Sequence, residues 1–227
     1  TELCQVVTIL APDFRGADVD HSDLSSLSLH RDQTFDAFDM RTGQLDSEAR
    51  DNLRRAFETA RNFAAEPDGW LVYMGDHGCG KTHLAAAIAN ERVAQGQPAL
   101  FVVVPDLLDH LRATFNPMST VTLDRRFEEV RNAPFLVLDD LGTHSATPWA
   151  QEKLYQLLNH RYNARLATVI TTSLDLEEIE PRLRARILDA RRVTIFAIVA
   201  PSYLDRLAHR QRTNGASRGR RTRSGGN

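Results

Sequence analysis

A glycine-rich octapeptide, GDHGCGKT at positions 75–82, restricts the folds that this chain can adopt. Its pattern, G-x-x-x-x-G-K-T, is that of a loop whose backbone N–H groups surround phosphate oxygens. An apolar run at 70–74 precedes it and a helix-forming run at 83–90 follows it, which is the strand–loop–helix context that the pattern requires. The octapeptide therefore predicts a nucleotide-binding α/β domain rather than an ordinary glycine turn.

The residue types in this loop indicate what each part does. Glycines let the backbone curl around phosphate, and the helix that follows adds its positive end. We expect Lys81 to reach the β- and γ-phosphates of ATP, and Thr82 to place its hydroxyl on Mg²⁺. The chain has 28 Lys and Arg residues but lysine only at positions 81 and 153, so a lysine in this loop is informative. The residues predicted to bind ATP or ADP are Gly75, Asp76, His77, Gly78, Cys79, Gly80, Lys81, Thr82 and His83.

A second informative stretch, FLVLDD at 135–140, is an apolar run that ends in two acids. It predicts a buried strand that delivers carboxylates at its carboxyl end, which is the ligand edge of an open α/β sheet. This is the Walker B pattern, in which Asp139 would hold Mg²⁺ and Asp140 would polarise the attacking water as a general base. The alternative is a strand that simply ends in a polar turn.

Composition limits the function classes. The 227 residues suffice for one sizeable α/β domain with flanking segments. The net charge of −2 does not by itself indicate nucleic-acid binding. The charge is uneven, however, with acidic residues concentrated near the start and arginines near the end. Cys4 and Cys79 provide neither a disulfide framework nor a four-cysteine zinc site. No run has membrane-spanning length and no signal peptide is visible, so we expect a cytoplasmic location without a membrane partner. The chain begins with Thr1, which leaves open a further N-terminal domain.

Strands and helices are predicted to alternate. The predicted strands of the core are 70–74, 99–104, 135–139, 167–172 and 193–199, with a further short strand at 3–10. The predicted helices are 47–64, the helix that follows the P-loop, 105–116, 123–130, 149–165, 177–190 and 201–212. Ser47 is the expected cap of the first helix, and Pro181 is expected to interrupt the helix 177–190. This order predicts a three-layer α/β fold with a five-stranded, mostly parallel sheet.

Three regions are expected along the chain. Residues 1–34 form an N-terminal extension whose part from 18 to 30 resembles a solvated linker, and residues 35–203 form the ATPase domain. Residues 204–227 form a basic, disordered tail. The tail either binds phosphate backbones or is an ordinary basic terminus.

With these stretches identified, the chain resembles the AAA+ ATPases, and within them the bacterial replicative-helicase loaders of the DnaC/DnaI type. The resemblance spans about residues 34–203. It is carried by the P-loop and its helix, FDAF at 35–38, LDDLG at 138–142, the strand VITTSL at 169–174 and the box PRLRAR at 181–186.

The resemblance implies further site residues and partners. Thr172 or Ser173 is the sensor 1 residue, and Arg186 is an arginine finger that acts on ATP bound by the next subunit of a head-to-tail assembly. A surface arginine is the alternative for Arg186. The implied partners are a DnaB-type replicative helicase and single-stranded DNA, the latter contacting the segment 106–126. The helicase-binding part of such loaders usually lies N-terminal to the ATPase core.

Three departures from the family pattern qualify the expected activity. Ser173 stands where sensor 1 is commonly Asn, and Asp140 stands where most AAA+ proteins have Glu, although the loaders use Asp. Too few residues follow the last strand for a full helical lid, which again is similar to the loaders. We therefore expect a slow ATP hydrolase without a full helical lid.

Three other functions stay open at this point. An IstB-type transposition helper ATPase shares the core and differs in its partner, a transposase. A small-molecule P-loop kinase would need an additional substrate-binding lid, and the paired acids and the arginine box argue against it. A non-hydrolysing, nucleotide-gated binding module is compatible with the residues found at positions 140 and 173.

Overall fold

The computed structural model describes residues 24–41, 43–113, 123–142 and 147–203. Its centre is a five-stranded sheet in the order β2-β3-β4-β1-β5, and every neighbouring pair is parallel. The strands are β1 (Trp70–Met74), β2 (Leu100–Val103), β3 (Phe135–Leu141), β4 (Ala167–Thr172) and β5 (Val193–Ala197). The predicted parallel α/β sheet is confirmed, with strand ends that differ from the prediction by two residues at most.

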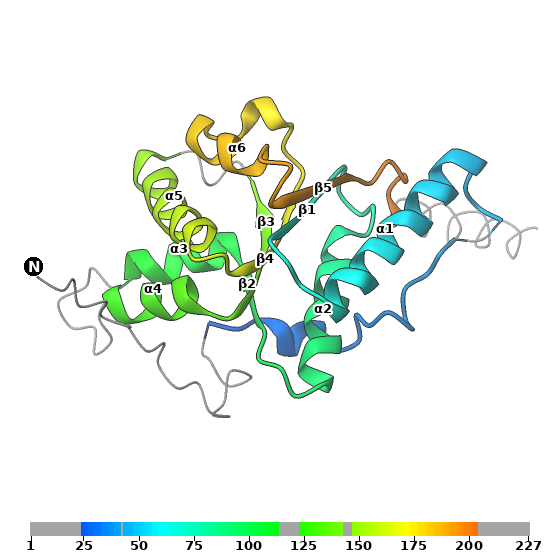
Figure 1. Cartoon of the computed structure of the whole chain (residues 1–227). Coiled ribbons are helices and arrows are strands. Elements are labelled where there is room, and N and C mark those ends of the chain that lie inside the picture. Colours follow the sequence, from blue (N-terminus) through cyan, green and yellow to red (C-terminus); the bar gives the residue numbers. More distant parts are fainter. Residues whose placement is uncertain (1–23, 42, 114–122, 143–146, 204–227) are drawn as a thin grey trace, which may run out of the picture.

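Helices cover both faces of the sheet, which gives the predicted three layers (Figure 1). One face carries α1 (Ser47–Ala65) and α2 (Lys81–Ala94). The other face carries α3 (Val104–Ala113), α4 (Leu123–Asn132), α5 (Pro148–Asn163) and α6 (Pro181–Ile187). Alternate strand residues enter the two cores: Leu71 and Tyr73 face α1 and α2, whereas Trp70 and Val72 face the opposite layer.

Helix α1 forms from an amphipathic pattern with a clear N-terminal cap. Leu53, Ala56 and Ala60 on one face are fully buried. The cap is Asp46, whose carboxylate accepts a hydrogen bond from the Ala49 N–H at 2.8 Å, so the predicted cap at Ser47 is wrong by one residue. Both residue types suit an N-cap, and position 47 already lies inside the helix.

Part of the predicted solvated linker packs on the domain. A 3₁₀ turn, η2 (Leu27–His30), lies beside β2, where the Ser26 N–H donates to the Phe101 carbonyl at 2.8 Å. Leu24 and Leu27 are buried, each in a different core. The linker prediction is therefore wrong for residues 24–30, because two leucines anchor an otherwise polar sequence. Residues 18–23 of that linker lie outside the described residues.

The predicted helix 177–190 is two separate elements. A 3₁₀ turn, η4 (Leu176–Glu178), precedes α6, which starts at Pro181 and ends at Ile187. Proline occupies the first helical position, where its missing N–H costs nothing, so Pro181 begins a helix rather than interrupting one. The predicted strand 3–10, the helix end at 116–117 and the tail 204–227 lie outside the described residues, and the predicted helix 201–212 is described only up to Tyr203.

A buried arginine connects α5 to the sheet. Arg161 is fully buried, and its guanidinium donates to Thr168 Oγ1 at 2.9 Å and to the carbonyls of Ala133 and Ala167 at 2.7 and 2.8 Å. Burial lowers the pKa of Arg161 to about 9. These bonds fix α5 against the starts of β3 and β4. Within the described ranges, no helix is both long and apolar enough to cross a membrane.

Candidate nucleotide-binding site

The P-loop connects the end of β1 to the start of α2, at the carboxyl edge of the sheet. Gly75, Gly78 and Gly80 all have positive φ, at 140°, 74° and 116°. A Cβ on Gly75 would lie 2.4 Å from the Ile198 carbonyl oxygen, so only glycine fits there. The first N–H groups of α2 are directed at this loop, which makes it a suitable place for an anion.

Lys81 lies in the loop with its ammonium group against the backbone. Its side chain is largely buried, and Nζ donates to the carbonyls of Gly75 and Asp76 at 2.7 and 2.9 Å. Cys79 Sγ lies 3.9 Å from the same Nζ. Burial raises the pKa of the Cys79 thiol, and the charge of Lys81 opposes part of that shift.

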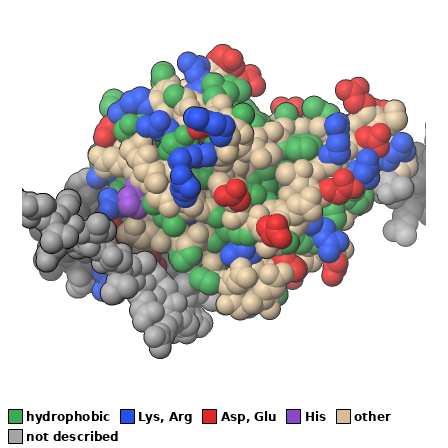
Figure 2. Space-filling model, viewed as in Figure 1, with side chains coloured by type: hydrophobic (Ala, Val, Ile, Leu, Met, Phe, Trp, Pro, Cys, Tyr) green, Lys and Arg blue, Asp and Glu red, His purple; other side chains and the backbone are tan. Residues whose placement is uncertain are grey.

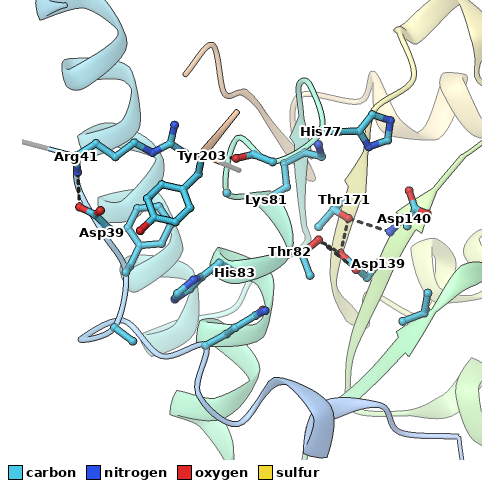
Figure 3. Close-up of a pocket in the computed structure, with 16 residues that line it drawn as sticks. Asp39, Arg41, His77, Lys81, Thr82, His83, Asp139, Asp140, Thr171 and Tyr203 are labelled. Carbon is cyan, nitrogen blue, oxygen red and sulfur yellow. Dashed lines mark hydrogen bonds between the residues drawn. The ribbon is translucent and has the colours of Figure 1, made fainter. Parts of the chain in front are cut away.

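Three oxygen-bearing side chains meet where α2 begins beside the ends of β3 and β4 (Figure 3). Thr82 Oγ1 donates to the two carboxylate oxygens of Asp139 at 3.0 and 3.2 Å, and Thr171 Oγ1 donates to Oδ1 of Asp139 at 2.6 Å. Asp139 is 6% exposed, and burial raises the pKa of its carboxyl while the two hydroxyl donors lower it. A hydroxyl and a carboxylate held side by side are the oxygen ligands that Mg²⁺ prefers, so these residues fit that ion.

An irregularity in β3 brings the second acid to the same cavity. The pairing of β3 with β4 shifts between Leu138 and Leu141, and Asp140 has a φ of 59°. The Asp140 N–H donates to Thr171 Oγ1 at 2.9 Å, which holds the shift in place. Successive residues of a regular strand face opposite sides, whereas here Asp139 and Asp140 both line one cavity.

This cavity has a volume of about 590 Å³, within the usual range for a nucleotide-sized ligand. The P-loop and the two acids form one side of it. Residues from the N-terminal segment form another side, together with Tyr203 from the segment after β5. Its lining is Gln33, Ala37, Phe38, Asp39, Arg41, His77, Gly78, Gly80, Lys81, Thr82, His83, Val103, Asp139, Asp140, Thr171 and Tyr203.

Most of the predicted nucleotide-binding residues line the cavity, and three of them do not. Gly75, Asp76 and Cys79 belong to the loop without lining the cavity. Thr172 is buried elsewhere: its hydroxyl donates to the Leu141 carbonyl at 2.5 Å and accepts the Leu174 N–H at 3.0 Å. Ser173 does not line the cavity either. The structure thus places neither sensor 1 candidate in the cavity, because Thr172 faces the opposite side of β4 from Thr171.

Sequence reasoning missed Thr171, Arg41 and Tyr203. A signal for Thr171 was available, because residues of one strand alternate between faces. Val137 and Val169 belong to the core under α1 and α2, so Asp139 and Thr171, each two residues further on, share the face of the P-loop helix. No local signal marks Arg41 or Tyr203, whose partners lie far away in the sequence.

Arg186 lies on α6, outside the cavity. Its guanidinium lies 5.0 Å from the centre of the Tyr162 ring, and Nη2 donates to Asn159 Oδ1 at 3.0 Å. Figure 2 shows several Lys and Arg side chains close together over this part of the molecule. Arg182 and Arg184 are its neighbours on the same short helix. Its predicted role as a finger toward another subunit stays a prediction.

A P-loop after β1, two acids near the end of β3 and the sheet order β2-β3-β4-β1-β5 define an ATP-binding protein of the AAA+ class. The sequence model of IstB-like ATP binding proteins matches residues 20–224, and the chain belongs to that family. The resemblance to the DnaC/DnaI-type loaders and their IstB-like relatives is thereby confirmed.

Curated relatives with similar sequences cover part of the chain. It is 28% identical to the replicative helicase loader DnaC of Escherichia coli strain K12 over 141 residues, which are 61% of this chain and 57% of DnaC. It is 32% identical to the replicative helicase loader DnaI of Bacillus subtilis strain 168 over 111 residues, which are 48% of this chain and 35% of DnaI. The matched region is therefore about half of these relatives or less.

Solved structures support the fold assignment. The crystal structure of the DnaC helicase loader superposes with a TM-score of 0.62 at 22% identity, covering 75% of this chain and 98% of that one. The crystal structure of DnaI gives 0.59 at 25% identity, covering 77% and 92%. The replication initiator DnaA, bound to AMPPCP and single-stranded DNA, gives 0.61 at 16% identity, covering 77% and 51%. At such identities the DnaC and DnaA superpositions bear on the fold alone.

Proposed function

We propose that this chain is a slow, ATP-driven AAA+ loader of a DnaB-type replicative helicase that binds single-stranded DNA. The observation that carries the ATPase part is the group formed by Thr82, Asp139 and Thr171 beside the P-loop. The names of the curated relatives, replicative helicase loaders DnaC and DnaI, support the choice of helicase as partner. A cytoplasmic location accompanies this proposal, because the partner and the DNA are there.

Each residue of the site has a proposed task in this reaction. Lys81 and the loop N–H groups bind the phosphates, and Thr82 and Asp139 hold Mg²⁺, which neutralises phosphate charge when bound. Asp140 orients and deprotonates the attacking water. Ser173 or Thr172 was the sensor 1 candidate from the sequence, and we propose Thr171 as the residue of β4 that positions both acids.

We further propose head-to-tail self-association, with Arg186 contributing charge to ATP on the neighbouring subunit. Its planar guanidinium is already oriented by Tyr162 and Asn159, which lowers the entropy cost of presenting it. The DNA contact is proposed for the segment 106–126, of which residues 114–122 lie outside the described part of the chain.

An IstB-type transposition helper is the second candidate. The family model that covers residues 20–224 favours it, since that match is longer than the matches to the helicase loaders. The ATPase chemistry would be the same, and the partner would be a transposase. A neighbouring transposase gene would favour this candidate over the loader.

ATP turnover, measured with and without single-stranded DNA over a range of protein concentrations, tests the proposal. We expect turnover per chain to rise with protein concentration and with DNA, because the finger acts between subunits. Tight ATP binding with no turnover under any condition would favour the non-hydrolysing binding module. Transfer of phosphate to a small-molecule acceptor instead of water would favour a kinase.

A further inference from the structure

Two segments that lie far from the P-loop in the sequence contact its backbone. After β5, the Ile198 N–H donates to the Met74 carbonyl at 2.8 Å, and the Tyr203 N–H donates to the Gly78 carbonyl at 2.9 Å. The chain between them passes so close that a Cβ on Gly78 would lie 2.6 Å from Ser202 Oγ. The second segment comes from before α1 and contributes Arg41.

Arg41 is 2% exposed, although its position before α1 is in an irregular segment. Its φ of 52° is unusual for a side chain of this size, and its N–H donates to Asp39 Oδ1 at 2.7 Å, which stabilises that turn (Figure 3). A strained backbone and a buried charge both cost free energy. The contacts of the guanidinium group offset that cost.

The guanidinium of Arg41 binds three backbone carbonyls on two segments. Nη2 donates to the carbonyl of Cys79 at 3.1 Å and more weakly to that of Gly78 at 3.5 Å, and Nη1 donates to that of Pro201. The guanidinium carbon lies 5.3 Å from the centre of the Tyr203 ring, within cation–π range. One planar cation thus joins the N-terminal segment, the P-loop and the segment after β5.

We propose that Arg41 is a positioning residue for nucleotide phosphate, acting through the backbone of the P-loop. The C=O and N–H of a trans peptide point in opposite directions, so holding the Cys79 carbonyl fixes where the Gly80 N–H points. Gly80 lines the cavity, and such an N–H group is what a P-loop offers to phosphate. The Arg41 charge also adds to that of Lys81 in attracting an anion.

This proposal rests on the proposed ATP binding, and nucleotides of different phosphate number test it. The unaltered chain, Arg41→Met and Arg41→Lys compete ADP and AMP against a fluorescent ATP analogue in the presence of Mg²⁺. Arg61→Met is the matched control, because it removes the same charge from an exposed arginine that contacts Phe35 of the same segment. Circular dichroism first establishes that each variant is folded.

We expect Arg41→Met to weaken ADP binding about tenfold, or about 1.4 kcal/mol, while AMP binding changes less than about threefold. Arg41→Lys should give a smaller loss of ADP binding, because an ammonium cannot span carbonyls as the guanidinium fork does. Arg61→Met should bind both nucleotides as the unaltered chain does.

Unchanged ADP binding by folded Arg41→Met would overturn the proposal. Equal losses for ADP and AMP would also overturn it, because a merely structural role weakens both alike. If Arg41→Met does not fold, unchanged ADP binding by Arg41→Lys overturns the proposal. Failure of the unaltered chain to bind ADP, or full binding by Lys81→Ala, would instead contradict the proposed function itself.

Discussion

Replacement of Thr171 by valine should weaken Mg²⁺ binding and leave nucleotide binding by the P-loop almost unchanged. The change keeps the branched shape and removes one hydroxyl, which donates to Asp139 Oδ1 at 2.6 Å and accepts the Asp140 N–H at 2.9 Å. A hydrogen bond to a charged group contributes about 1.5–3 kcal/mol and a neutral one about 0.5–1.5 kcal/mol. The variant therefore loses about 2–4.5 kcal/mol in total, shared between folding stability and the site.

A large part of this lost free energy should appear as weaker Mg²⁺ binding. Removal of a residue that orients a metal ligand typically costs about 10–100-fold in metal affinity, or about 1.4–2.8 kcal/mol. We therefore expect the Mg²⁺ concentration for half-maximal ATP turnover to rise by about that factor in Thr171→Val. ATP affinity in EDTA should change less than about threefold, because the P-loop is unaltered.

Thr172→Val is the comparison that decides the assignment. Thr172 lies next in β4 and its hydroxyl also makes two hydrogen bonds, but to the backbone of Leu141 and Leu174. It should lose a similar amount of stability in urea unfolding and keep its Mg²⁺ dependence. A shifted Mg²⁺ dependence in Thr172→Val with none in Thr171→Val would refute the geometric reasoning and return the sensor role to the position that the sequence indicated.

Three further outcomes are expected. Gly75→Ala should unfold at lower urea and bind ATP more weakly, with a cost of about 1–3 kcal/mol for the strained φ and the close Ile198 carbonyl, whereas Gly43→Ala, with positive φ and open surroundings, should retain its ATP affinity. Arg161→Leu should lose about 3 kcal/mol or more of unfolding free energy in urea, because several buried carbonyls lose their donor; a loss under about 1 kcal/mol would contradict this. Burial raises the pKa of Asp139, and Mg²⁺ needs the ionised carboxylate, so Mg²⁺ affinity should fall with decreasing pH at a higher pH than for an ordinary aspartate, and at a still higher pH in Thr171→Val; a calorimetric Mg²⁺ titration across pH checks the sign.

The core strands were predictable because a parallel strand covered on both faces is a short, nearly continuous apolar run. The runs at 70–74 and 167–172 coincide with β1 and β4. The N-terminal segment was not predictable in the same way. Leu24 and Leu27 stand in a polar context without a period, and only the finished fold supplies the surfaces that bury them.

Arg41 could not be found from local pattern for a similar reason. The carbonyls that its guanidinium binds lie 37, 38 and 160 positions away in the chain, and all three belong to the backbone. Every residue has a backbone carbonyl, so no residue type near Cys79 or Pro201 indicates the contact. Only the topology, which returns the chain after β5 to the side of the P-loop, brings these groups together.

Asp139 and Asp140 show where the alternation of side chains along a strand predicts the site and where it does not. Strand alternation correctly groups Asp139 with Thr171 on the face of α2, and would direct Asp140 to the other face. The irregularity between Leu138 and Leu141 overrides alternation, and it depends on a non-glycine residue at a φ of 59° whose N–H is held by Thr171. Such strain persists only where other contacts over-determine it. The position of the proposed general base therefore follows from one threonine hydroxyl on the neighbouring strand, which makes Thr171 the residue whose loss should move both acids at once.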